Sequence, residues 1–124
     1  MADRGAALNN LAVGDIFHAA SPAAPSMICL VMAVTDMGIQ ARTVTHQLHL
    51  EFDRQTGVAK WASDERVLGA VVDSVAPLPV DIHNVMLGID RKFRLEQDSE
   101  RLKLNDAEKR ALIYVDFHYA SNRV

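Results

Sequence analysis

Apolar and polar residues alternate between His46 and Gly57, where every second residue from Leu48 to Phe52 is apolar. A period of two residues is typical of a β-strand that buries one face. Gly57 can adopt the positive φ that a short hairpin loop often needs, and the chain continues as Val58–Trp61. This region therefore predicts a half-buried strand, a turn and a returning strand.

Three more strands are predicted before this hairpin. A turn at Gly14–Asp15 leads into a short strand, and the apolar run Met27–Thr35 follows a loop that contains two prolines. The nearly unbroken apolar character of that run predicts burial on both faces. The third strand, Ile39–Val44, alternates and places Gln40 and Arg42 on its outward face.

One further strand is predicted at the end of this β-rich region. Residues 63–66 favour a helical turn, and Val71, Val72 and Val75 favour extended backbone after it. Five or six short strands over about residues 13–76 must curl to bury one face and cover their edges. We therefore expect a small bent antiparallel sheet or a barrel that is SH3-like in general shape.

The pattern changes to the period of a helix after Pro79. Apolar residues then recur at spacings of three and four, as in a helix with one buried face: Ile82, Val85, Met86, Ile89 and Phe93. A second helix is predicted after Asn105, because Asn is a favourable cap and Glu108 follows at the capping-box position. The expected fold class is α+β, with two C-terminal helices after the strands.

Residues 107–120 allow two interpretations. In a strand, Ile113, Val115, Phe117 and Tyr119 would share one face, whereas a helix distributes the apolar residues over two faces. We favour the helix. Apolar residues on two faces of one helix predict deep burial or a subunit contact, so we expect a homo-oligomer or another protein partner.

Composition predicts a single domain over residues 1–124. Of the 124 residues, 49% are hydrophobic, which is enough for a continuous core without disulfides. We expect residues 1–10 to be frayed, residues 11–76 to form the β-rich part and residues 77–124 to form the helical part.

Charge and cysteine content narrow the classes of partner and compartment. The chain has 13 Lys and Arg against 16 Asp and Glu, and neither residues 1–79 nor residues 80–124 carry a basic excess, so we expect no nucleic-acid partner. The longest apolar run, Met27–Val34, is too short to span a bilayer, and no signal peptide is recognisable, so we expect no membrane contact. The single Cys29 lies in that run and is expected to pack in the core of a cytoplasmic protein.

The spacing of the histidines argues against metal chemistry. His46 and His49 are three residues apart, so on one strand their rings point to opposite faces. Asp81 and His83 are two residues apart on a predicted helix, where their side chains diverge. We therefore expect no metal site, and the absence of a phosphate-binding or dinucleotide motif leads us to expect no cofactor.

Two sets of residues are candidates for acid-base catalysis. If the C-terminal segment were a strand, Tyr114, Asp116 and His118 would form one polar row, which is the best catalytic candidate in the chain. His49 and Glu51 share a face of the hairpin strand and form the second candidate set. A structural hydrogen-bonded network is the competing interpretation of either set.

Trp61 and Arg54 are candidates for a binding site. Trp61 can close one end of the barrel, or it can present its indole face in a groove that has the loops around Pro22–Pro25 and Arg54–Thr56 at its rim. The basic run Arg91–Arg94 lies near the end of a predicted helix, where positive charge is favoured.

These observations favour a small cytoplasmic protein-interaction or ligand-sensing module that dimerises through its helices. A small enzyme with acid-base residues assembled from separate elements is an alternative, although the sequence lacks linear catalytic motifs and we lean against catalysis. A structural subunit of a larger assembly is a further alternative.

Overall fold

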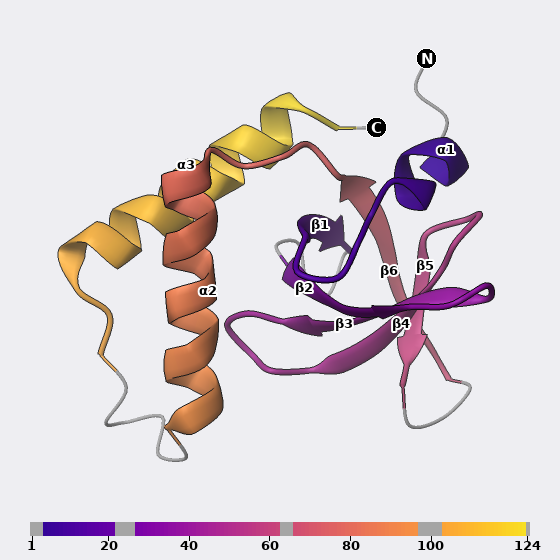
Figure 1. Cartoon of the computed structure of the whole chain (residues 1–124), viewed down its shortest axis with the longest axis horizontal. Coiled ribbons are helices and arrows are strands. Elements are labelled where there is room, and N and C mark those ends of the chain that lie inside the picture. The colour runs from indigo at the N-terminus through magenta and orange to yellow at the C-terminus, as the bar shows by residue number, and fades with distance from the viewer. Residues whose placement is uncertain (1–3, 22–26, 63–65, 97–102, 124) are drawn as a thin grey trace.

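The centre of the protein is a closed antiparallel β-barrel, seen in a computed structural model that describes residues 4–21, 27–62, 66–96 and 103–123 (Figure 1). Each strand pairs with the next along the chain, and β1 pairs with β6 to close the barrel. The prediction of a small barrel followed by two helices is confirmed. The strands are β1 (Ile16–Ala20), β2 (Met27–Val34), β3 (Gly38–Thr43), β4 (His49–Asp53), β5 (Val58–Trp61) and β6 (Val67–Ser74).

Strand β2 separates two hydrophobic cores, and this explains its unbroken apolar sequence. Cys29 and Val31 face the interior of the barrel, whereas Ile28 and Leu30 face the helices. Inside the barrel, the rings of Phe17 and Phe52 meet edge to face with centroids 5.0 Å apart. Burial on both faces, predicted for the whole run, holds from Met27 to Val31 and ends at the exposed Met32.

Two long helices, α2 (Val80–Leu95) and α3 (Asp106–Ser121), cover one side of the barrel. Figure 1 shows α2 alongside the barrel and α3 crossing α2, and the C-terminal half of α3 also reaches the end of β6. The helices and the outer face of the barrel share the second core, which consists of Ile16, Ile28, Leu30, Val44, Leu78, Met86, Ile89, Ala111, Val115 and Tyr119. Helix α2 is thereby fixed against the barrel.

A buried ion pair also fixes α2 to the barrel. Nε and Nη2 of Arg42 donate hydrogen bonds to the two carboxylate oxygens of Asp90, at 2.9 and 2.7 Å. Nε2 of Gln47 donates a third bond to the same carboxylate at 2.8 Å. The predicted outward direction of Arg42 is correct with respect to the barrel interior, but its side chain is buried beneath α2 instead of lying in solvent.

The structure corrects two expectations near the ends of elements. Strand β4 begins at His49, although the alternation that predicts it begins at Gln47, because residues 44–46 form a turn and Gln47 has a φ of 57°, which is incompatible with a strand. Residues 4–9, which we expected to fray, form the short helix α1 (Arg4–Asn9), and its Leu8 is completely buried in the barrel core. The predicted helical turn at residues 63–66 and the predicted loop at residues 21–26 lie for the most part outside the described residues.

Residues 106–121 form a helix, so the interpretation that we favoured for this segment is confirmed. Its start is a capping box, as predicted: the Asn105 side chain accepts from the Glu108 backbone N–H at 2.8 Å, and the Glu108 carboxylate accepts from the Asn105 N–H at 2.9 Å. A side-chain oxygen at this position satisfies a backbone donor that has no partner within the helix.

Replacing Asn105 by alanine is expected to lower the free energy of unfolding by about 1 kcal/mol, because the Glu108 N–H loses its acceptor. Urea unfolding followed by circular dichroism measures this change. Asn84→Ala, at an exposed position inside α2, is the matched control and is expected to be neutral or slightly stabilising. Equal losses in both variants would contradict the role assigned to the cap.

Candidate functional site

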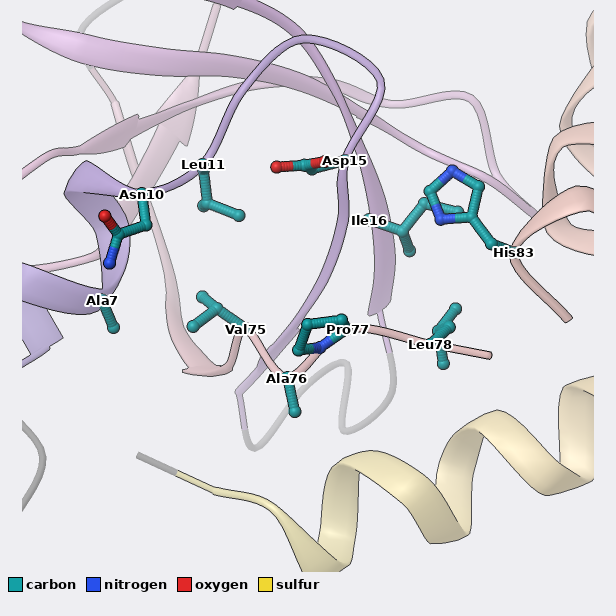
Figure 2. Close-up of a pocket in the computed structure, with 10 residues that line it drawn as sticks. All are labelled: Ala7, Asn10, Leu11, Asp15, Ile16, Val75, Ala76, Pro77, Leu78 and His83. Atoms are coloured by element: carbon teal, nitrogen blue, oxygen red, sulfur yellow. The ribbon is translucent and has the colours of Figure 1, made fainter. Parts of the chain in front are cut away.

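A cavity of about 410 Å³ lies between α1, the start of β1, the segment after β6 and the start of α2 (Figure 2). Figure 2 shows Ala7, Asn10 and Leu11 on the α1 side of the cavity, and Ile16 and His83 on the α2 side. Most of the lining is apolar, and the polar residues are Asn10, Asp15 and His83. The complete lining consists of Ala7, Asn10, Leu11, Asp15, Ile16, Val75, Ala76, Pro77, Leu78 and His83.

The turn that carries Asp15 is held rigidly against β2. Gly14 has a φ of 93°, which glycine adopts without strain, and its N–H donates to the carbonyl oxygen of Val31 at 3.0 Å. The Val31 N–H in turn donates to the carbonyl oxygen of Asp15 at 2.9 Å. The backbone of Asp15 is therefore positioned by hydrogen bonds on both sides of the turn.

The Asp15 side chain brings a negative charge to this apolar cavity. One carboxylate oxygen accepts a hydrogen bond from the Ala12 N–H at 2.9 Å, which orients the group. Figure 2 shows the carboxylate directed toward the side on which Leu11 lies. The other two polar residues are Asn10 and His83. The side-chain nitrogen of Asn10 donates to the Ala6 carbonyl oxygen at 3.4 Å, and His83 lies in the first turn of α2.

A buried polar cluster joins the barrel to the C-terminal half of α3. Nδ1 of His18 on β1 lies 2.5 Å from Oδ1 of Asp73 on β6, and the His18 ring stacks on Tyr119 with centroids 5.3 Å apart. The Ser74 hydroxyl donates to the carbonyl oxygen of Asn122 at 2.7 Å, and burial raises the pKa of the Tyr119 hydroxyl. The cluster links three elements and does not line the cavity of Figure 2, so we interpret it as structural.

Helix formation separates the first set of catalytic candidates. Tyr114 and His118 are one turn apart and stack with centroids 6.1 Å apart, while Asp116 lies on a different side of α3. Nε2 of His118 lies 3.2 Å from the carbonyl oxygen of Ala76, which ties α3 to the segment after β6. The polar row that a strand would have produced is therefore not formed.

The second set of catalytic candidates lies on the outward face of β4. His49 is exposed, and Glu51 is half-buried with its carboxylate 3.8 Å from Nζ of Lys60 on β5. Glu51 also lines a smaller cavity of about 270 Å³ with Met37, Thr56 and Lys60, but His49 does not. The two side chains thus share a face, as predicted, without sharing a cavity.

Trp61 and Arg54, the two candidates for a binding site, both contact other parts of the fold. Trp61 is half-buried and packs against the barrel core, and its interpretation as a residue that closes one end of the barrel stays a prediction. Arg54 donates to the carbonyl oxygen of Thr35 at 2.9 Å and to the side-chain oxygen of Asn9 at 3.1 Å, so it links the hairpin to α1. Neither residue lines the two cavities described above.

Cys29 is completely buried in the barrel, and burial raises the pKa of its thiol far above the usual range. Sγ lies 3.7 Å from the carbonyl oxygen of Met27. A thiol that is buried and protonated is a poor nucleophile. This environment agrees with the packing role that the sequence predicts.

Sequence reasoning did not identify the cavity of Figure 2. It assigned Asp15 to a turn and His83 to a helix, and no sequence spacing connects either residue with Ala7 or Val75. The one available signal was the glycine before Asp15, which marks a turn that must have a fixed shape. The pair of His18 and Asp73 was missed for the same reason, because its members are 55 residues apart.

Among the described residues, no three His, Cys, Asp or Glu side chains come together in a way that could hold a metal ion. None of the helices in the described ranges is long and apolar enough to cross a membrane. No protein-family model, curated protein or solved structure matches the chain.

Proposed function

We propose that this protein is a ligand-sensing module that binds a small molecule in the cavity between α1 and α2. The observation that carries the proposal is the cavity itself, whose volume of about 410 Å³ falls within the usual range for small-molecule sites. Its lining also has the usual character, with seven apolar residues and three polar ones that can fix the orientation of a ligand.

The charge of the cavity favours a particular class of ligand, a small amine with an apolar body. The Asp15 carboxylate attracts a cation and can accept its hydrogen bond. Leu11, Ile16 and Val75 offer apolar contact to the rest of the molecule. A carboxylate or phosphate ligand would instead meet a like charge.

The position of the cavity supports a sensing role. Its walls come from α1, from the turn before β1 and from residues 75–78, which connect the barrel to α2. A ligand in this place contacts all three parts of the chain at once. Occupancy is therefore expected to restrict their relative motion and to raise the stability of the native state.

Thermal unfolding with matched small molecules tests the proposal. We expect benzylamine and isobutylamine to raise the midpoint temperature with the logarithm of their concentration above the dissociation constant, and the corresponding alcohols and carboxylates to raise it less or not at all. A ligand at about 100 times its dissociation constant stabilises the native state by about 2.7 kcal/mol. Isothermal titration calorimetry with the same compounds then gives the affinity directly.

Two variants locate the effect. In Asp15→Asn, the amide oxygen can still accept from the Ala12 N–H, but the negative charge is lost, so the amine-induced shift is expected to disappear. Asp36→Asn, in the exposed turn before β3, makes the same change of charge elsewhere and is expected to keep the shift. No response to any amine, or an equal response in Asp15→Asn, would overturn the proposal.

A further inference from the structure

The outward side of α3 carries a stripe of exposed apolar side chains. Phe117 is 71% exposed, Ile113 is 58% exposed and Tyr114 is 43% exposed. The opposite side of the helix is buried against α2 and the barrel through Ala111, Val115 and Tyr119, among others. The stripe is therefore additional to the face that the fold uses, and contiguous exposed apolar surface is characteristic of an interaction site.

Charged residues flank this stripe in a self-complementary order. Lys109 and Asp116 are both exposed and are seven residues apart, close to two full turns, so they lie on the same flank of α3. Ile113 lies about midway between them along the helix. One flank thus has a positive end and a negative end, with the apolar stripe beside it.

We propose that α3 packs antiparallel against α3 of a second copy, about a two-fold axis near Ile113. Such an axis places the same flank of both helices on one side of the contact, and the two helices run in opposite directions. Each Lys109 therefore faces Asp116 of the second copy. Ile113 and Phe117 then bury each other's apolar surface at the centre of the contact. A parallel pair is disfavoured, because Lys109 and Arg110 of the two copies would meet at the same level.

The proposed interface is separate from the ligand cavity. None of the residues that line the cavity belongs to α3, so self-association and ligand binding can be tested independently. The two-fold arrangement also explains why the sequence of α3 has apolar residues on two sides: one set packs within the subunit and the other between subunits. Interfaces of this kind place apolar residues at the centre and charges at the rim.

Sedimentation velocity over a wide range of protein concentration tests the proposal. We expect a reversible monomer–dimer equilibrium for the unmodified chain, and an increase of at least about 30-fold in the dissociation constant for Phe117→Ser or Ile113→Ser. Met37→Ser removes an apolar side chain that is 83% exposed in the turn after β2, and is expected to leave the equilibrium unchanged. Circular dichroism confirms that each variant is folded.

Charge exchange tests the direction of the helices. Lys109→Asp and Asp116→Lys are each expected to weaken the dimer, because each places like charges opposite one another, whereas the double variant restores both pairs and is expected to dimerise like the original chain. A chain that is monomeric at all concentrations, or a dimer that survives both serine variants, would overturn the proposal. Failure of the double variant to restore dimerisation would overturn the antiparallel register.

Discussion

Asp90→Ala is expected to lower the free energy of unfolding by about 3–5 kcal/mol, because it leaves the buried guanidinium of Arg42 without its partner. Asp90 is only 3% exposed and Arg42 is 8% exposed, so both partners of the pair are withdrawn from solvent. The amide of Gln47, which donates to the same carboxylate, loses an acceptor as well. Urea unfolding at neutral pH measures the loss.

Two controls separate the ion pair from other effects. Asp81→Ala removes an exposed carboxylate from the first turn of the same helix, and its expected cost is at most about 1 kcal/mol. The double variant Arg42→Met, Asp90→Leu removes both charges, and is expected to recover most of the stability that Asp90→Ala loses. If Asp90→Ala and Asp81→Ala had equal effects, the pair would not hold α2 in place.

The same pair predicts how stability depends on pH. Burial raises the pKa of Asp90, but the hydrogen bonds from Arg42 and Gln47 outweigh burial and hold the pKa below its usual range. A carboxylate whose pKa is lower in the folded state stabilises that state above its unfolded pKa, about 3.9, and the contribution is lost as the pH falls through the folded pKa. The difference in unfolding free energy between the original chain and Asp90→Ala is therefore expected to shrink below about pH 4. A difference that stays constant with pH would contradict this account.

Tyr119→Ala is also expected to cost about 3–5 kcal/mol, the usual penalty for truncating a large buried aromatic side chain. Tyr119 is 1% exposed and stacks on His18, so its ring fills the seam between α3 and the barrel. Removing the ring opens a void that the surrounding elements can close only by shifting. Chemical unfolding of the variant, followed by fluorescence of the single Trp61, measures the loss.

Tyr119→Phe is the matched control for the ring. No described residue offers a hydrogen-bond partner to the Tyr119 hydroxyl, although the oxygen is buried. Removing a buried hydroxyl that lacks a partner is expected to change stability by no more than about 1 kcal/mol, and in the stabilising direction. A loss in Tyr119→Phe as large as that in Tyr119→Ala would show that the hydroxyl, not the ring, maintains the seam.

Local patterns were sufficient to predict most elements of the fold. The alternation before Gly57 and the capping box at Asn105 each depend on residues a few positions apart, so the sequence displays them directly. The start of β4 was predicted too early because Gln47 leaves the strand conformation, and its amide bonds to Asp90 on α2. A tertiary contact determines where the strand begins, and the pattern of apolar residues along the strand does not reveal that contact.

The candidate site was harder to predict because its residues come from distant parts of the chain. Asp15 and His83 line one cavity only because the segment after β6 returns across the end of the barrel. The burial of Arg42 has a similar origin, since its partner is 48 residues away on another element. Strand periodicity identified the side of β3 on which Arg42 lies, but it carries no information about what covers that side.

Closure of the barrel has a consequence for how the chain acquires its fold. Five of the six strand pairings join neighbours along the chain, whereas the pairing of β1 with β6 joins segments about 55 residues apart and must wait until β6 has been synthesised. Until then, β1 and the latest strand each present unpaired backbone groups that can recruit strands from other molecules. The aggregation hazard of this protein is thus concentrated in nascent or truncated chains that lack β6, and it ends when the last strand docks.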